Sequence, residues 1–256
     1  MSELLLEVAG LCKDFGGLEA VKDVSFTVHE GQIKALIGPN GAGKTTIFNL
    51  LTGVLPPDAG RARFRGRELL GMPSHRVAAL GIGRTFQTSQ LFDQMTVLEN
   101  VMVGHHLQGS ATMLSAALRL FGAGAEERRY REVAMEALAR AGLMDLAGRQ
   151  AAALSIGQRR MVEVARALAA EPQLLLMDEP AAGLNMRETE RLAETIQRIR
   201  DSGVTILLVE HDMSLVMSVA EEILVLDRGE PLAEGTPEEI RSDERVLAAY
   251  LGEVTD

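Results

Sequence analysis

The sequence predicts an α/β protein with a β-rich N-terminal part, a mixed or parallel sheet core and a smaller α-helical lobe. Its 256 residues are enough to bury one large core. Short β-like runs fill the first third, whereas the segment from Val97 to about Ala170 is helical in character. Strands and helices then alternate, as in a parallel sheet flanked by helices. We expect a single domain over residues 1–256, with a core of about 1–95 and 171–256 and a helical lobe of about 96–170.

The expected strands are short apolar runs bounded by turn or helix signals. They are Leu4–Val8, Val24–Val28 and Ile33–Ile37 in the first third, and Leu174–Met177, Val204–Val209 and Ile223–Leu226 in the last. Arg187–Arg200 is predicted to be a helix, because apolar residues fall on one stripe at Leu192, Ile196 and Ile199. The small-residue segment Gln108–Gly124 is expected to be a mobile loop that holds a short helix.

The composition excludes several classes of protein. No apolar stretch approaches the roughly 18 residues that a membrane-spanning helix needs, so the chain is not expected to cross a membrane. Lys and Arg number 26 against 36 Asp and Glu, and the net charge of −10 works against binding to nucleic acid. Cys12 is the only cysteine, and Glu3 and Glu7 stand where a secretory signal would be basic and then apolar. We expect a cytoplasmic protein with no nucleic-acid partner.

The strongest motif is Gly38-Pro-Asn-Gly-Ala-Gly-Lys-Thr45, which fits the phosphate-loop pattern and lies between a β-like run and the helix-like Thr46–Leu51. Glycines let the backbone turn so that N–H groups point at phosphate oxygens, and the helix that follows adds its positive end. Lys44 is expected to reach the β- and γ-phosphates of a bound nucleotide, and the Thr45 hydroxyl to ligate Mg²⁺. The expected nucleotide-binding residues here are Gly38, Pro39, Asn40, Gly41, Ala42, Gly43, Lys44, Thr45 and Thr46.

The second motif is an apolar strand that ends in two carboxylates, Asp178 and Glu179. At the C-terminal edge of a buried strand, Asp178 can hold Mg²⁺ through water, and Glu179 can orient and deprotonate the water that attacks the γ-phosphate. Alone the pattern is weak, because any strand that ends in a polar turn looks similar. Beside a phosphate loop it favours attack of water on a γ-phosphate.

The third motif is Leu154-Ser-Ile-Gly-Gln158, which opens a predicted helix with Ser155 as a plausible N-cap. A helix start that carries Ser and Gly is a second anion-binding site. One nucleotide in one chain does not need two phosphate cradles. We therefore expect this site to serve the nucleotide held by another copy or by a paralogue.

On these motifs the chain resembles the ATP-binding cassette (ABC) family over essentially its whole length. That family carries a signature of the Leu-Ser-Gly-Gly-Gln type about twenty residues before its Asp-Glu strand, as Leu154–Gln158 precedes Asp178. The resemblance implies a P-loop NTPase fold with a RecA-like core. It also implies that two such subunits pair head to tail around ATP and Mg²⁺, with Ser155, Gly157 and Gln158 facing the partner's nucleotide.

The resemblance also implies roles for single residues. Phe15 looks like the aromatic residue that stacks on adenine, although a core Phe is an equal alternative from the sequence. Gln87 resembles the glutamine that senses Mg²⁺, and a solvated glutamine is its alternative. His211 looks like the switch histidine at the γ-phosphate. The implied catalytic residues are Lys44, Gln87, Glu179 and His211, and the implied metal ligands are Thr45, Gln87 and Asp178.

Two residues depart from the family pattern. Ile156 stands where glycine is commonest in the signature, and Asn185 ends the interface loop where aspartate is usual. Either change could lower the rate of hydrolysis. The run Ala181–Asn185, however, is similar to the G-type ATP-binding subunit of branched-chain amino-acid importers. That branch implies a second ATPase subunit, two membrane permeases and, indirectly, a periplasmic solute-binding protein, with this chain at the inner face of the cell membrane.

Alternatives remain open from the sequence. The ATPase of another ABC transporter, for lipopolysaccharide export or for uptake of another amino acid or urea, has a similar length and tail. A soluble ABC protein of DNA repair or translation is a less suitable match, because this chain has one phosphate loop and no heptad run. A small-molecule kinase would leave Leu154–Gln158 and His211 without a role. A groove near Gln87–Glu99 is expected to receive a permease helix through Leu91, Phe92 and Met95, with packing inside the helical lobe as an equal alternative.

Overall fold

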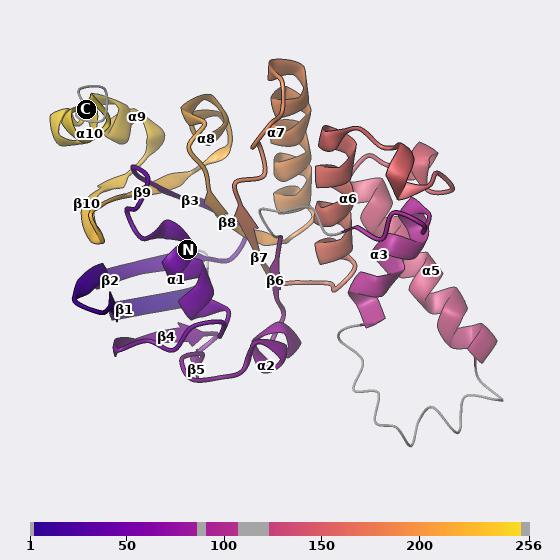
Figure 1. Ribbon diagram of the computed structural model, residues 1–256, viewed down its shortest axis with the longest axis horizontal. Coiled ribbons are helices and arrows are strands. Elements are labelled where there is room, and N and C mark those ends of the chain that lie inside the picture. Colours follow the sequence, from indigo (N-terminus) through magenta and orange to yellow (C-terminus); the bar gives the residue numbers. More distant parts are fainter. Residues whose placement is uncertain (1–2, 86–90, 107–122, 252–256) are drawn as a thin grey trace.

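The computed structural model describes residues 3–85, 91–106 and 123–251. Figure 1 shows two sheets on one side of the molecule and a group of helices on the other. The strands are β1 Leu4–Phe15, β2 Leu18–His29, β3 Ile33–Ile37, β4 Ala59–Phe64, β5 Arg67–Glu68, β6 Ile82–Arg84, β7 Leu174–Asp178, β8 Thr205–Val209, β9 Glu222–Asp227 and β10 Glu230–Gly235. The helices are α1 Lys44–Leu51, α2 Ser74–Ala79, α3 Val97–His106, α5 Ala123–Arg140, α6 Ile156–Leu168, α7 Met186–Asp201, α8 Met213–Val219, α9 Pro237–Ser242 and α10 Glu244–Leu251, with short 3-10 turns at Met144–Leu146 and Ala151–Ala153.

The main sheet has the strand order β10-β9-β3-β8-β7-β6. Its neighbours from β6 to β9 pair in parallel, and β10 runs antiparallel to β9. The predicted mixed α/β sheet is therefore confirmed. Since parallel strands end at one common edge, the loops that follow β3, β7 and β8 come together there, as at ligand sites in open α/β sheets.

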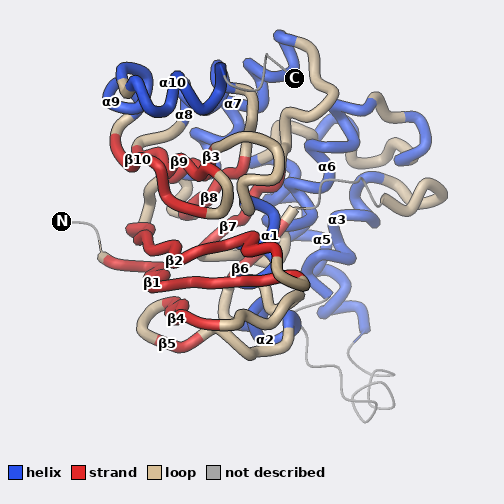
Figure 2. Tube along the Cα trace, turned by 60° about the vertical axis from the view of Figure 1, so that its left-hand side comes forward, coloured by secondary structure: helices blue, strands red, loops and turns tan. Residues whose placement is uncertain are grey.

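The second sheet is antiparallel, with the order β2-β1-β4-β5. Figure 2 shows it as a separate layer below the main sheet. β1 and β2 extend well beyond the predicted Leu4–Val8 and Val24–Val28 because they pair with each other from Leu4↔His29 to Phe15↔Leu18, so cross-strand hydrogen bonds carry them through polar residues.

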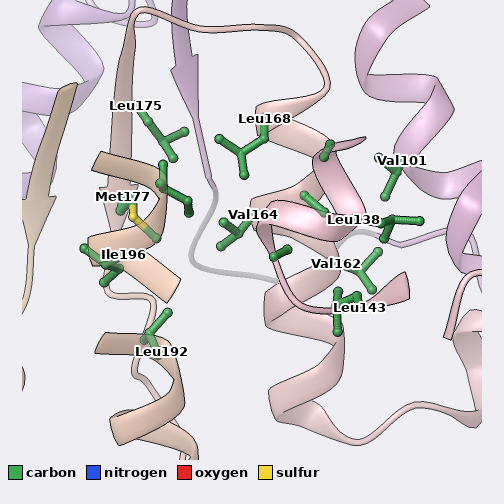
Figure 3. Packing of buried hydrophobic residues seen from close by; sticks show 14 of the residues in the cluster. Val101, Leu138, Leu143, Val162, Val164, Leu168, Leu175, Met177, Leu192 and Ile196 are labelled. Carbon is green, nitrogen blue, oxygen red and sulfur yellow. The ribbon is translucent and has the colours of Figure 1, made fainter. Parts of the chain in front are cut away.

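A hydrophobic cluster joins the helices to the main sheet. Figure 3 shows Val164 and Leu168 of α6 between Leu175 of β7 on one side and Val101 and Leu138 of α3 and α5 on the other. All five side chains are at most 2% exposed. A second cluster lies between the two sheets and around α1, and a third lies between the main sheet, α8 and the C-terminal helices.

The predicted helix at Arg187–Arg200 fits these packing faces. α7 spans Met186–Asp201 rather than the predicted Arg187–Arg200, and it buries the predicted stripe Leu192, Ile196 and Ile199. The predicted loop and short helix at Gln108–Gly124 lie mostly outside the described residues, and α5 begins at Ala123. Within the described ranges, no helix combines the length and apolar character that a bilayer crossing requires. The division into a core and a helical lobe stays a prediction.

Truncation of Leu208 tests the importance of the central strand. Its side chain is 0% exposed on β8, so Leu208→Ala is expected to lower the free energy of unfolding by about 2–5 kcal/mol through lost burial and a residual cavity. Urea denaturation followed by circular dichroism measures the change. Met144→Ala is the control, because Met144 is 52% exposed and its truncation should alter stability by no more than about 0.5 kcal/mol. Equal effects of the two changes would contradict this account of the core.

Candidate nucleotide-binding and hydrolysis site

The phosphate loop leaves β3 and enters α1 as the sequence predicts. Gly38, Gly41 and Gly43 have φ values of +149°, +79° and +97°, a region that favours glycine. A Cβ atom on Gly38 would lie 2.1 Å from the Leu226 carbonyl oxygen, and one on Gly43 would lie 2.4 Å from the Ala20 carbonyl oxygen. Neighbouring backbone therefore requires glycine at both ends of the loop.

The Lys44 ammonium lies inside this loop. Its Nζ donates hydrogen bonds to the carbonyl oxygens of Gly38 at 2.6 Å and Pro39 at 2.8 Å, and the residue is 7% exposed. Thr45, the next residue, is exposed, and Thr46 is half-buried. The loop thus holds the buried Lys44 ammonium, which can bind phosphate, and exposes the Thr45 hydroxyl, which can ligate Mg²⁺.

Asp178 ends β7 with its carboxylate almost completely buried, at 3% exposure. Nη2 of Arg84 donates to Oδ2 of Asp178 at 2.9 Å. The backbone N–H of Asp178 donates to the Thr85 hydroxyl at 3.3 Å. Oδ1 has no hydrogen-bond partner among the described residues. A buried carboxylate oxygen without a partner is costly, so it fits a site that receives a hydrated Mg²⁺.

Glu179 follows directly in a left-handed conformation, with φ +47°. Its N–H donates to the Val209 carbonyl oxygen at 2.9 Å, which ties the turn to the end of β8. Non-glycine residues rarely adopt this conformation, and they do so mainly where the surrounding structure imposes it, often at functional sites. The side chain is half-buried at the edge where β3, β7 and β8 end.

His211 lies on the loop after β8, two residues beyond the pair Asp178↔Val209. Its side chain is 59% exposed, and Nδ1 lies 3.7 Å from Oε2 of Glu210. The strand order places this loop beside the ends of β3 and β7. The structure therefore brings the phosphate loop, Asp178, Glu179 and His211 to one edge of one sheet.

Two residues of this edge have roles that the sequence did not reveal. Arg84 links Asp178 to α1, because its Nη1 also donates to the side-chain oxygens of Asn49 at 2.8 Å and Thr52 at 3.1 Å. Glu210 is 0% exposed, and burial raises the pKa of its carboxyl, against the smaller lowering effect of the Ala181, Asp212 and His211 N–H groups. Glu210 could have been found from the sequence, because a carboxylate follows an apolar strand there as it does at Asp178. The contacts of Arg84 depend on tertiary packing and have no such signal.

The signature motif opens α6 as predicted. The Ser155 side chain accepts from the Gln158 N–H at 3.2 Å, and the Gln158 side chain accepts from the Ser155 N–H at 3.0 Å, which is a reciprocal capping box. Ile156 is 67% exposed beside this cap. Ser155, Gly157 and Gln158 line a hollow of about 300 Å³ together with residues of α7.

Asn185 caps α7 in the same way, through a reciprocal bond pair with Glu188. The second oxygen of Glu188, Oε1, lies close to Gly157, because a Cβ atom built there would be 2.7 Å from it. The start of α7 and the signature are thus neighbours, and Leu184 of the predicted interface loop also lies beside Gly157.

Phe15 and the predicted groove lie on the periphery. The Phe15 ring is 46% exposed at the tip of the β1–β2 hairpin, with Nζ of Lys13 5.5 Å from its centroid, so the alternative of a core Phe is wrong.

A hollow of about 470 Å³ runs between α2, β6, α3 and α6, and Phe92 lines it with half of its surface exposed. Leu91 instead packs in the core. Gln87 lies outside the described residues.

Comparison with known proteins gives the family. Residues 21–182 match the family described as ABC transporter, and residues 230–256 match the one described as branched-chain amino acid ATP-binding cassette transporter. The chain is 46% identical over 254 residues to the high-affinity branched-chain amino acid transport ATP-binding protein BraF of Pseudomonas aeruginosa, covering 99% of this chain and 100% of that protein. It is 38% identical over 248 residues to the lipopolysaccharide export system ATP-binding protein LptB of Escherichia coli K12, covering 97% of each.

Solved structures agree with this result. An ATP-binding cassette of an ABC transporter in its ADP conformation has a TM-score of 0.86 and 34% identity, covering 98% of this chain and 100% of that one. A dimeric structure of a bacterial ABC transporter cassette has a TM-score of 0.76 and 25% identity, covering 91% of this chain and 99% of that one. The chain belongs to the ABC transporter family, as one of its ATP-binding cassettes, and it is an ATPase.

Proposed function

We propose that this chain is the ATP-hydrolysing subunit of an importer for branched-chain amino acids. The observation that carries the proposal is the full-length identity of 46% and 47% to two ATP-binding proteins of branched-chain amino acid transport. The separate match of residues 230–256 to that transporter family supports the same branch. On this proposal the chain lies in the cytoplasm against the inner face of the membrane, bound to two permease subunits that receive solute from a periplasmic binding protein.

The site residues divide the hydrolysis between them. The Lys44 ammonium and the N–H groups of the loop bind the β- and γ-phosphates. Glu179 accepts a proton from water as that water attacks the γ-phosphorus, and the bond to the β-phosphate oxygen breaks, releasing ADP. His211 binds a γ-phosphate oxygen and stabilises its negative charge.

Thr45, Asp178 and, from the family resemblance, Gln87 would hold Mg²⁺. The unpartnered Oδ1 of Asp178 supports this assignment, since it faces no donor among the described residues. Mg²⁺ would supply positive charge to the β- and γ-phosphates.

Pairing with a second ATPase subunit completes each site. The capped start of α6 carries the exposed Ile156 and the Ser155 hydroxyl, and the dimeric cassette among the similar structures supports an association of this kind. The partner's γ-phosphate would be bound by Ser155 and Gly157, so ATP favours the paired state and its hydrolysis releases it.

The groove lined by Phe92 is proposed to receive a cytoplasmic helix of a permease. Phe92 and Val77 give the groove apolar walls. It lies between α2 and β6 on one side and α3 and α6 on the other. A helix seated there would contact both parts at once, which suits the transmission of motion. Met95, three residues after Phe92, is 38% exposed, and its contact with a permease helix stays a prediction.

Deletion of the gene in its own organism tests the function. Uptake of labelled leucine, isoleucine and valine should fall, and a plasmid copy of the chain should restore it whereas a Lys44→Met copy should not. Unchanged uptake would contradict the proposal.

Lipopolysaccharide export is the second candidate, favoured by the 38% identity to the export ATPase. If the chain served lipopolysaccharide export, its depletion would cause lipopolysaccharide to accumulate inside the cell while amino-acid uptake stayed normal. The lower identity makes it the weaker candidate.

Truncation of Phe15 tests the proposed adenine contact. Loss of an aromatic stack is expected to raise KM for ATP by about 2- to 10-fold, with kcat little changed. Steady-state phosphate release measures both constants. Leu18→Ala is the matched control, because Leu18 is 70% exposed on the same hairpin. If Leu18→Ala and Phe15→Ala behave alike, Phe15 does not stack on the base.

A further inference from the structure

Glu210 lies between the two loops that carry the proposed hydrolytic residues. Asp178 pairs with Val209 in the register of β7 and β8, so Glu179 and Glu210 follow neighbouring strands at the same edge of the sheet. Glu210 is the first residue after β8, and His211 is the next. The Glu210 side chain points inward, since the residue is 0% exposed whereas the His211 side chain is 59% exposed.

Both carboxylate oxygens of Glu210 accept backbone hydrogen bonds. Oε1 accepts from the Ala181 N–H at 2.7 Å, in the turn that follows Glu179. Oε2 accepts from the His211 N–H at 2.9 Å and from the Asp212 N–H at 3.2 Å. A buried carboxylate is retained only where such donors replace water, and here the donors belong to two different loops.

The turn after β7 requires such support. Glu179 is held at φ +47°, and its own N–H bonds to the Val209 carbonyl oxygen at 2.9 Å. Together with the bond from Ala181 to Glu210, the end of β8 therefore anchors this strained turn at two points. Strained backbone conformations persist where neighbouring contacts over-determine them.

We propose that Glu210 is a positioning residue for ATP hydrolysis, whose buried carboxylate sets the Glu179 turn and the His211 loop in one fixed relation. The inference rests on the proposed roles of Glu179 and His211. Glu210 itself touches neither nucleotide nor water in this role. Displacement of either loop would move the proton acceptor relative to the γ-phosphate ligand, which lowers the rate of reaction more than the affinity for ATP.

Glu210→Gln is the primary test, because the amide has nearly the same shape but only one acceptor oxygen. That oxygen can serve Ala181, or His211 and Asp212, and the NH₂ group then faces the N–H donors of the other loop. We expect kcat to fall about tenfold or more while KM for ATP stays within about twofold. Glu210→Asp keeps both oxygens on a shorter side chain, and it should lose activity as well because it cannot reach both loops.

Amide hydrogen exchange gives a second readout that does not need turnover. In Glu210→Gln the amides of Ala181, or those of His211 and Asp212, should exchange about tenfold faster than in the original chain. The amides of Leu176 and Leu207, inside β7 and β8, should keep their protection.

Glu222→Gln is the matched control. Its carboxylate is 34% exposed at the start of β9, far along the strand direction from the site, and accepts from Lys34 at 2.8 Å and Gln32 at 3.0 Å. It should lower the melting temperature without lowering kcat.

The outcomes distinguish failure of the positioning role of Glu210 from failure of the proposed function. Original values of kcat in Glu210→Gln, or a kcat loss accompanied by exposure of the Leu176 and Leu207 amides, would overturn the positioning role. If the original chain hydrolyses no ATP, the proposed function fails instead, and exchange at the three loop amides still decides whether Glu210 ties the loops together.

Discussion

Glu179→Gln is expected to lower the rate of ATP hydrolysis by about 10²- to 10⁴-fold, the usual contribution of a general base. The amide retains the shape of the side chain but cannot accept a proton from water. The backbone contacts of the turn, such as the Glu179 N–H to the Val209 carbonyl oxygen, remain available. ATP should therefore stay bound, and the paired state should accumulate. Phosphate release measures the rate, and gel filtration at saturating ATP with the pairing subunit present measures the association.

Glu171→Gln is the matched control for this change. Glu171 is also a non-glycine residue with positive φ, at +49°, and its side chain is exposed after α6. Its amide variant should keep the original rate. The sandwich mechanism is wrong if Glu179→Gln remains monomeric at saturating ATP while its partner is present, and the proton-acceptor role is wrong if it hydrolyses ATP at the original rate.

Lys44→Met is expected to weaken ATP binding by about 2–4 kcal/mol, or about 30- to 1,000-fold in Kd, because a buried cation that pairs with phosphates is removed. The methionine side chain retains the apolar stem, whereas the carbonyl oxygens of Gly38 and Pro39 lose the Lys44 Nζ as a donor. Titration calorimetry measures the Kd directly.

Lys22→Met serves as the control for Lys44→Met. Lys22 lies on β2 and pairs with Glu230 at 3.1 Å, with 33% of its side chain exposed. Its Kd for ATP should equal that of the original chain. Unchanged affinity in Lys44→Met, or equal losses in the two variants, would show that Lys44 does not bind phosphate.

The order of the main elements was predictable because local and tertiary signals agree there. The apolar run of β7, the stripe of α7 and the cap at Ser155 each specify their element alone. Strands β4, β5, β6 and β10 escaped prediction. Exposed arginines at Arg61 and Arg63 alternate with buried Ala62 and Phe64, but this period-two pattern is too short to predict β4, which pairs with β1 from Ala59 to Phe64.

The site was predictable to the level of its motifs. Phosphate-loop residues and the two carboxylates are recognisable because their spacing is fixed by the loop itself. The partners that orient them come from distant segments. Arg84 meets Asp178 across 94 positions of sequence, and Glu210 meets Ala181 across 29, so only the folded chain reveals these contacts.

The contact between Gly157 and Glu188 has a mechanical consequence. One carboxylate oxygen of Glu188 accepts from the Asn185 N–H, and the other lies where a Cβ atom on Gly157 would come within 2.7 Å of it. Because Glu188 adjoins both helix starts, we expect a displacement of the start of α7 to shift the start of α6 as well. A ligand bound at one of these two helix starts would therefore be sensed at the other.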